Sequence, residues 1–351
     1  MLKAVYAPYR LWFKFPAKTS RATMNYKDTY FIKIWDDSDH NVFGIGECAL
    51  FRGLGCDDCP DYEAVLDNAC KNINNIDIDS IRKFPSIVFG VETALSDLRS
   101  GGIRKPFPSE WTDGNGSITI NGLVWMGTAE DMKRRVQEKI GQGFRCIKFK
   151  IGGIDFESEV ELIKNIRAAF SPNVLEIRLD ANGAFAPDIA LDRLEILSSY
   201  SIHSIEQPIR PGQRDDMRRI CKESPIPIAL DEELIGFDPV KAKGLLEYER
   251  PDYIILKPSL CGGFSGAQEW ITAAESLGIG WWITSALESN IGLNAIAQWT
   301  YRHNVTIPQG LGTGQLYTNN IGSPLVQSGE SLIYDNTWIW SLPDLKWNGE
   351  N

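Results

Sequence analysis

From about residue 116 onward, short apolar runs alternate with longer amphipathic stretches that are rich in polar residues. This alternation is typical of βα units on a parallel sheet. The repetition favours an α/β fold with a closed (β/α) barrel, because the glycine-rich GxGxxG turn of an open doubly wound sheet is missing after the early strands. Eight runs have the composition of strands: 118–121, 146–150, 175–180, 202–206, 226–231, 253–257, 280–284 and, less clearly, 306–311.

The residues before the barrel follow a different pattern. One strand-like aromatic run and two stretches with apolar residues at helical spacing predict an α+β capping domain over residues 1–115. The barrel domain is then expected over residues 116–320. Apolar runs at 331–334 and 337–340 predict added strands, so that residues from about 320 to 351 leave the barrel and complete the capping domain.

Composition and charge narrow the class of protein. The chain has 351 residues, is 43% hydrophobic and has a formal net charge of 36 − 46 = −10, which is typical of a soluble globular protein. Its acidity disfavours nucleic acids and anionic membranes as partners, because both attract clustered Lys and Arg. No apolar run reaches the roughly 18 to 20 residues that span a bilayer, and the first residues lack the order of a signal peptide. We therefore expect a cytoplasmic protein that binds a small molecule, as a monomer or as a homo-oligomer.

Seven cysteines are scattered along the chain. Their odd number and wide spacing disfavour a disulfide framework. Cys56 and Cys59 form a CxxC pair, but no second pair or thioredoxin-like unit accompanies it. A loop is therefore favoured there over a zinc or redox site.

Three predicted strands end on a carboxylate, and one βα unit separates each from the next. Asp180, Glu206 and Asp231 are spaced by 206 − 180 = 26 and 231 − 206 = 25 residues. Because the carboxyl ends of barrel strands converge on one mouth, three carboxylates would repel one another there unless a cation or water lay between them. All-oxygen ligation favours Mg²⁺, for which Mn²⁺ can substitute, over zinc. The alternative for each acid taken alone is a solvated residue or a cap of the next helix.

Three lysines accompany these carboxylates. Lys148 and Lys150 lie two positions apart on one predicted strand, so both side chains point to the same face. Ile147 and Phe149 take the other face, which disfavours a solvated edge strand and places the two amines inside the barrel. Lys257 ends the sixth strand, which lies opposite the second in an eight-stranded ring. A lysine needs a lowered pKa to act as a base near neutrality, and we expect the neighbouring lysine and a divalent cation to shift the pKa in that direction.

Five short motifs hold these charged residues: Lys148-Phe149-Lys150, Leu179-Asp180-Ala181-Asn182-Gly183, Ile205-Glu206-Gln207-Pro208, Leu230-Asp231-Glu232 and Leu256-Lys257-Pro258. Together they resemble the enolase superfamily, in particular its muconate-lactonizing branch. The resemblance implies a modified (β/α)7β barrel with an N-terminal capping domain. It also implies Mg²⁺ bound by Asp180, Glu206 and Asp231, with Asn182 and Glu232 supporting the ligands. Lys150 would be the general base, Lys257 the acid, base or cationic stabiliser on the opposite face, and Lys148 a further member of the catalytic group.

Segments 284–294, 309–314 and 20–21 resemble one group within this branch. Its members dehydrate 2-succinyl-6-hydroxy-2,4-cyclohexadiene-1-carboxylate to an aromatic product in menaquinone synthesis. The resemblance implies a lyase that works through an enediolate formed beside the carboxylate. Ala286 and Asn290 depart from serines that are common in the group. Contacts to a carboxylate substrate are expected from Arg21, Ser285, Ser289, Gly312 and Thr313.

Two other functions stay open. A racemase or epimerase of the same branch, acting on N-acylamino acids or dipeptides, would also need two lysines on opposite faces. Dipeptide epimerases, however, typically place an Asp-x-Asp near the last strand, where this chain has Gly312-Thr313-Gly314. A non-catalytic binding barrel is a remoter alternative, because such a protein would normally have lost one of the charged groups that are all present here.

Overall fold

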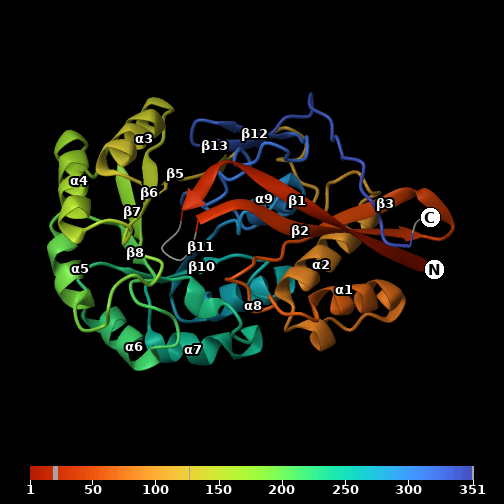
Figure 1. Cartoon of the computed structure of the whole chain (residues 1–351), viewed down its shortest axis with the longest axis horizontal. Helices are drawn as coiled ribbons and strands as arrows, with labels where there is room; N and C mark the ends of the chain where they lie inside the picture. The colour runs from red at the N-terminus through yellow and green to blue at the C-terminus, as the bar shows by residue number, and fades with distance from the viewer. Residues whose placement is uncertain (19–22, 126, 350–351) are drawn as a thin grey trace.

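The computed structural model describes residues 1–18, 23–125 and 127–349. An antiparallel sheet with two helices lies at one end of the molecule, and a parallel sheet covered by helices lies at the other (Figure 1). The N-terminus and the last described residues lie at the end with the antiparallel sheet (Figure 1). This arrangement confirms the predicted fold class, a TIM-like α/β barrel with an N-terminal α+β part.

The N-terminal sheet has the strand order β1-β2-β3, and two helices pack against it. The second of these helices approaches β3 closely, because glycines face each other there. A Cβ on Gly46 would lie 1.9 Å from the carbonyl oxygen of Gly90, so this packing excludes any larger residue at Gly46. The elements are β1 (Leu2–Lys18), β2 (Thr23–Asp36), β3 (Asp39–Cys48), α1 (Tyr62–Lys71) and α2 (Pro85–Arg99), with short 3₁₀ turns at Ile73–Asn75 and Ile78–Ile81.

Within the described residues, seven parallel strands form one curled sheet in the order β5-β6-β7-β8-β9-β10-β11. Each strand lies beside the next in sequence, and the connecting helices cover the outer face (Figure 1), as in a (β/α) barrel. The strands are β5 (Gly122–Val124), β6 (Cys146–Lys150), β7 (Glu176–Asp180), β8 (Ser204–Glu206), β9 (Ile228–Leu230), β10 (Tyr253–Leu256) and β11 (Gly280–Ile283). The helices are α3 (Ala129–Gly141), α4 (Phe156–Ala169), α5 (Ala190–Ser198), α6 (Arg214–Glu223), α7 (Ala242–Glu249), α8 (Gly263–Ser276) and α9 (Asn290–Tyr301), with 3₁₀ turns at Glu232–Leu234 and Pro239–Lys241.

A short bridging segment links the two edges of this sheet. Gly310 N donates to Ile283 O (2.8 Å) on the β11 side, and Asn121 N donates to Gln309 O (2.9 Å) beside β5. Both contacts are parallel bridges rather than a regular strand. The weak eighth run predicted at 306–311 therefore takes part in closing the barrel.

The first predicted barrel strand is displaced. Residues 118–119 form β4 (Ile118–Thr119), which pairs antiparallel with β13 (Ser331–Tyr334) instead of joining the barrel. β13 also pairs with β12 (Leu325–Ser328). Two residues after β4, the chain enters the parallel sheet as β5, which is the first strand of the barrel.

The strand predicted at 331–334 is confirmed, but the one predicted at 337–340 is wrong. Those residues form a turn, in which Thr337 N donates to Asp335 Oδ1 (2.9 Å). The chain beyond the turn runs back to the N-terminal sheet, where Asn348 N donates to Tyr6 O (2.8 Å).

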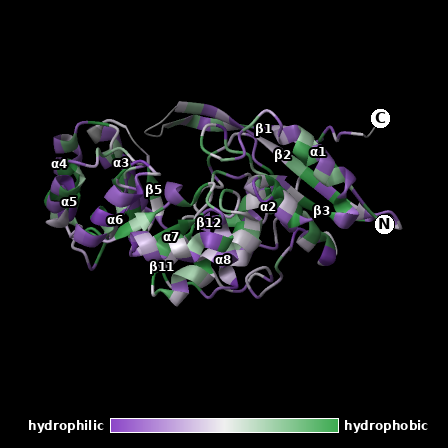
Figure 2. Ribbon diagram, turned by 90° about the horizontal axis from the view of Figure 1, so that it is seen from below, coloured by the Kyte–Doolittle hydropathy of each residue, from purple (hydrophilic) through white to green (hydrophobic). Residues whose placement is uncertain are grey.

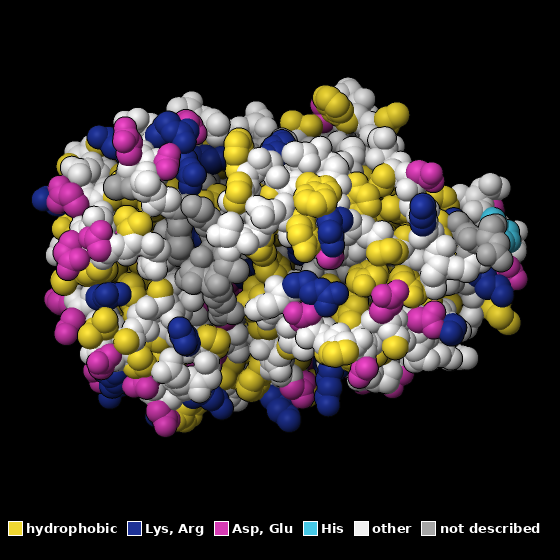
Figure 3. Space-filling model, viewed as in Figure 1, with side chains coloured by type: hydrophobic (Ala, Val, Ile, Leu, Met, Phe, Trp, Pro, Cys, Tyr) yellow, Lys and Arg dark blue, Asp and Glu magenta, His cyan; other side chains and the backbone are white. Residues whose placement is uncertain are grey.

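Apolar side chains form one core between the barrel strands and their helices and another between the N-terminal sheet, α1 and α2. Hydrophobic and hydrophilic residues are interleaved along the outer helices (Figure 2), as expected for helices with one face on the core. On the face shown in Figure 3, cationic and acidic side chains are interspersed, without a field of one sign. No helix in the described part of the chain is long and apolar enough to cross a membrane.

Glu249, at the end of α7, is a buried carboxylate that links pH to stability. Its Oε1 accepts a hydrogen bond from Arg214 Nε (3.1 Å). Burial, and next the charge of Glu233, raises the pKa of Glu249 from 4.5 to about 7. As pH rises, the unfolded chain therefore loses this proton before the folded chain does, and the free energy of unfolding falls between the two pKa values.

We expect Glu249→Gln to reduce this pH dependence. Between pH 5 and pH 8, the free energy of unfolding in urea should fall by roughly 1 to 3 kcal/mol more in the wild type than in the variant. Glu247→Gln, an exposed position on the same helix, is the control and should follow the wild type. Parallel pH profiles for Glu249→Gln and the wild type would contradict this account.

Candidate active site

Strand register brings the predicted charged residues to the carboxyl end of the barrel. Lys150 on β6 is the strand neighbour of Asp180 on β7, which in turn neighbours Glu206 on β8. Asp231 and Lys257 directly follow β9 and β10. Alternate residues of a strand face the same side, so the strands bring these charged side chains together at one end of the barrel, as the spacing in the sequence predicts.

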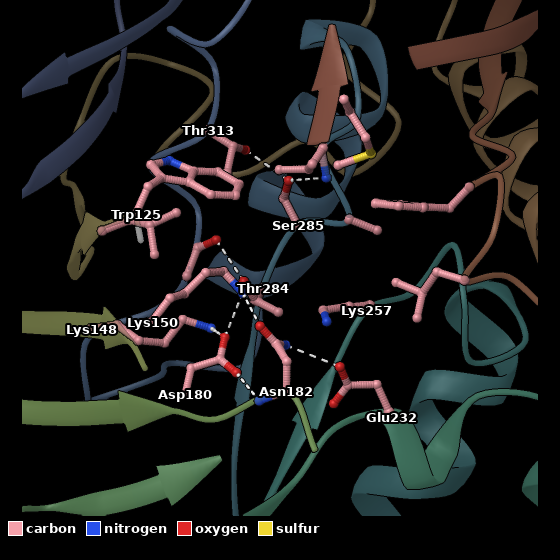
Figure 4. Close-up of a pocket in the computed structure, with 18 of the residues that line it drawn as sticks. Trp125, Lys148, Lys150, Asp180, Asn182, Glu232, Lys257, Thr284, Ser285 and Thr313 are labelled. Atoms are coloured by element: carbon pink, nitrogen blue, oxygen red, sulfur yellow. Dashed lines mark hydrogen bonds and ion pairs between the residues drawn. The ribbon is translucent and has the colours of Figure 1, made fainter. Parts of the chain in front are cut away.

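Ion pairs join these side chains, and Figure 4 shows Lys148 and Lys150 beside Asp180. Lys148 Nζ contacts Glu206 Oε2 (2.7 Å) and Asp180 Oδ2 (3.1 Å). Lys150 Nζ contacts the same Asp180 oxygen (2.8 Å) and donates to Asn182 Oδ1 (2.8 Å). On the other side of the barrel, Lys257 pairs with Asp231.

A hydrogen bond ties the predicted supporting residues together. Asn182 Nδ2 donates to Glu232 Oε1 (3.0 Å), so Asn182 connects Glu232 to the amine of Lys150. Both supporting residues line the same pocket as Lys150. Asn182 Oδ1 contacts that amine directly, and Glu232 acts on it through Asn182.

The buried charges shift one another's pKa values. Burial lowers the pKa of Lys148, but Asp180 and Glu206 raise it more, so its pKa lies above the usual range. Lys257 behaves in the same way, with Asp231 as the main charge that raises its pKa. In this arrangement the carboxylates in contact with Lys148 and Lys257 outweigh the desolvation of these amines.

The carboxylates divide into two kinds. Burial raises the pKa of Asp180, but Lys148 and Lys150 lower it more, so this group stays ionised. For Glu206, burial and the charge of Asp180 raise the pKa well above its usual value. An added cation would favour the ionised form of Glu206.

The residues fit a hard divalent cation, although their side chains contact lysines here. Among the described residues, no three His, Cys, Asp or Glu side chains are grouped as a ready cation site. Yet Glu206 Oε1 is buried without a hydrogen-bond partner in the described structure. Asp180 and Asp231 are 0% and 2% exposed and offer further oxygens beside it. An all-oxygen set of this kind suits Mg²⁺.

A cavity of about 180 Å³ opens above these charges. Its floor holds Lys148, Lys150, Asp180 and Lys257 (Figure 4). The walls are largely apolar and come from both the barrel and the N-terminal part of the chain. They are formed by Met24, Phe51, Arg52, Gly53, Leu54, Asn121, Leu123, Trp125, Asn182, Glu232, Thr284, Ser285, Ala286, Leu287, Gly310, Gly312 and Thr313.

Only some of the residues predicted to contact the substrate line the pocket. Ser285, Gly312 and Thr313 line the pocket, and the hydroxyls of Ser285 and Thr313 lie 2.7 Å apart. Ser289 does not line it: its hydroxyl accepts from Ile291 N (3.1 Å) and caps α9, so a substrate contact from this residue is not supported. Arg21 lies outside the described residues.

The apolar wall of the pocket contains residues that were not predicted from the sequence. Trp125 follows β5 directly, and its ring lies 5.8 Å from Lys150 Nζ. Its position after a barrel strand could have identified it. Met24 and Phe51 belong to the N-terminal part of the chain, and no local pattern relates them to the barrel mouth.

Comparison with known proteins agrees with this geometry. A family described as "Enolase C-terminal domain-like" matches residues 131–316, which include all three carboxylates and all three lysines. The chain belongs to the enolase superfamily. The predicted membership, in the muconate-lactonizing branch, is confirmed.

Individual proteins show which members of the superfamily this chain resembles. It is 45% identical to an o-succinylbenzoate synthase from Desulfotalea psychrophila, over 92% of this chain and 96% of the relative. The crystal structure of MenC from D. psychrophila LSv54 superposes with a TM-score of 0.84 at 41% identity and covers 95% of this chain and 99% of that one. A dipeptide epimerase from Enterococcus faecalis V583, solved with Mg and L-Leu-L-Tyr, has a TM-score of 0.82 at 21% identity, covering 95% and 97%, and so shares the fold.

Proposed function

We propose that this enzyme is a lyase that dehydrates 2-succinyl-6-hydroxy-2,4-cyclohexadiene-1-carboxylate to o-succinylbenzoate, with Mg²⁺ as cofactor and Mn²⁺ as a substitute. The observation that carries the proposal is the 45% identity to an o-succinylbenzoate synthase along nearly the whole of both chains. The arrangement of three lysines and three carboxylates below one small pocket supports it.

In this mechanism Lys150 moves the proton. Its amine faces the pocket and is held by Asp180 and Asn182, both at 2.8 Å. Removal of the proton beside the substrate carboxylate leaves an enediolate, and the protonated Lys150 then returns a proton to the departing hydroxyl, which leaves as water. Bound by the oxygens of Asp180, Glu206 and Asp231, Mg²⁺ would supply positive charge for the developing dianion.

Lys257 and Lys148 hold positive charge on either side of the reacting centre. Lys257 enters from β10, across the barrel from Lys150 on β6, and would stabilise the negative charge from the opposite face. Lys148 lies against Glu206 and Asp180, where it keeps these carboxylates in place.

The pocket walls suit a ring with a carboxylate tail. Trp125, Leu123 and Phe51 provide apolar surface for the ring. Ser285 and Thr313 provide hydroxyl donors for a carboxylate. Residues 312–314 carry no acid that would bind the ammonium of a dipeptide, which favours the dehydratase over a dipeptide epimerase.

Ultraviolet detection of aromatisation tests the proposal. The purified protein with Mg²⁺ should convert the succinyl-hydroxycyclohexadiene carboxylate, and EDTA should stop the reaction, with Mn²⁺ restoring part of it. If no product forms with either metal, the assignment is wrong. Lysines on opposite sides of the pocket then favour the second candidate, a racemase of N-acylamino acids, which deuterium exchange at the α-carbon of N-succinylamino acids would detect.

A further inference from the structure

Three charged side chains are buried where the N-terminal sheet meets the barrel, away from the pocket lining. Lys27 on β2 is 5% exposed, and Glu47 on β3 and Glu288 after β11 are both 0% exposed. Burying charge is costly unless each group is compensated. The contacts of these three side chains lead to the wall of the active site.

Glu47 binds the start of α9 across the interface. Its carboxylate accepts hydrogen bonds from Ser289 N (3.0 Å), Ser289 Oγ (2.6 Å) and Gly292 N (3.0 Å). Thr29 Oγ1, on the neighbouring strand, donates to the same carboxylate (3.0 Å). A negative charge is favourable at a helix N-terminus, so Glu47 ties α9 to the N-terminal sheet.

Glu288 holds the loop just before α9. It accepts hydrogen bonds from Ala286 N (2.7 Å) and from Ser259 Oγ (2.5 Å). Ala286 lines the pocket, and Ser259 lies two residues after Lys257. One buried carboxylate therefore contacts both the pocket wall and the turn that carries Lys257.

The loop between these contacts is strained. Leu287 lines the pocket with a φ of 62°, a left-handed conformation that costs energy for a residue with a branched side chain. Its N–H donates to Ser285 Oγ (2.9 Å), and its carbonyl accepts from Tyr317 Oη (2.7 Å). A strained loop persists only where its surroundings hold it, and here they include the buried carboxylates on both sides.

Lys27 is the buried amine of this cluster. Its Nζ has no hydrogen-bond partner among the described residues and lies 5.9 Å from the centre of the Phe51 ring, which lines the pocket. Burial lowers the pKa of Lys27 below its usual value, and the charges of Glu47 and Glu288 offset this only in part. Burial raises the pKa of Glu288, and Lys27 is the first of the charges that lower it.

We propose that Lys27 and Glu47 are positioning residues of the active site. Their buried side chains, supplied by the N-terminal sheet, keep residues 284–287 and the Lys257 turn in the geometry that catalysis needs. The proposal rests on the proposed dehydratase function for its kinetic readout. Its structural readout, the protection of the loop amides, does not depend on any activity.

Two substitutions and one matched control test the proposal. Glu47→Gln keeps the shape of the side chain but removes its charge, and Lys27→Met removes the amine from the cluster. Asp97→Asn is the control, since Asp97 on α2 is also a fully buried carboxylate and accepts from Ile45 N (3.0 Å) on β3, but its hydrogen bonds go to Ile45 and Arg104 and not to residues 284–292. Lys27→Arg keeps a basic side chain at this position and tests whether it retains the activity that Lys27→Met loses.

Hydrogen exchange measures the loop directly. We expect the peptide that covers residues 284–292 to exchange faster in Glu47→Gln and Lys27→Met, and to be unchanged in Asp97→Asn. Under the same conditions, kcat/KM for dehydration should fall about 10- to 100-fold in the first two variants and less than about threefold in the control. Lys27→Arg should recover most of the lost kcat/KM.

Two results would overturn the proposal. Unchanged exchange in the 284–292 peptide of Glu47→Gln and Lys27→Met would remove their positioning role, whatever the kinetics. Equal kinetic losses in Asp97→Asn would show that general destabilisation, rather than loop position, explains the effect. If the wild type itself fails to dehydrate the substrate, the functional proposal is wrong, and the exchange data still decide the structural one.

Discussion

Lys150→Ala is expected to lower kcat for dehydration by about 10³- to 10⁴-fold, which is the contribution of a well-placed general base. The amine of Lys150 faces the pocket and is held at 2.8 Å by both Asp180 and Asn182. Removing it deletes the group that moves the proton. Asp180 keeps its contact with Lys148 (3.1 Å), so the variant should stay folded and keep nearly all of its affinity for Mg²⁺.

Steady-state ultraviolet kinetics measure the loss, while thermal unfolding and calorimetric titration with Mg²⁺ check the fold and the cation site. Lys139→Ala is the matched control, because Lys139 on α3 is a half-buried lysine whose amine lies over Phe144 (4.9 Å), away from the pocket. It should retain wild-type kcat. Activity of Lys150→Ala within tenfold of the wild type would remove Lys150 from the mechanism.

The charged floor of the pocket could be predicted because two simple periodicities determine it. Alternation along β6 places Lys148 and Lys150 on one face, and in-register pairing of β6, β7 and β8 places Asp180 and Glu206 beside them. The catalytic roles of these residues remain predictions. Their convergence at one end of the barrel follows from local pattern and from the geometry of parallel strands.

The pocket wall could not be predicted in the same way, because turns and distant segments build it. Leu287 adopts a left-handed conformation, so residues after β11 no longer follow strand alternation, and Ser289 turns toward Glu47 instead of the pocket. Phe51 reaches the pocket from the N-terminal part of the chain. Such a contact depends on how two parts of the fold pack, which sequence spacing does not encode.

The wrong strand at 337–340 has a similar cause. The aromatic and β-branched residues there have the composition of a strand. However, Asp335 accepts the N–H of Thr337 and starts a turn, and Trp340 packs against the core around Phe31 and Ile45 of the N-terminal sheet. Hydrophobic contact with a distant sheet therefore outweighs local strand propensity.

Glu206→Gln is expected to have the second large effect, because it alters a buried carboxylate that is proposed to bind the cation. Burial and the charge of Asp180 raise the pKa of Glu206, and its Oε1 is buried without a hydrogen-bond partner in the described structure. A neutral amide removes one negative charge and one oxygen ligand. We expect the half-saturating Mg²⁺ concentration to rise about 10- to 100-fold and kcat to fall by at least about 100-fold.

Thermal unfolding distinguishes the loss of a cation ligand in Glu206→Gln from general destabilisation of the fold. Because a ligand that binds only the native state stabilises it, Mg²⁺ should raise the unfolding midpoint of the wild type but not that of Glu206→Gln at the same concentration. Glu176→Gln is the control. Glu176 is also a carboxylate on a barrel strand, but it is the first residue of β7, at the opposite end from Asp180, and it pairs with Arg178 (2.8 Å). An equal shift by Mg²⁺ in the wild type and Glu206→Gln would place the cation elsewhere, since loss of a ligand must weaken any site that uses it.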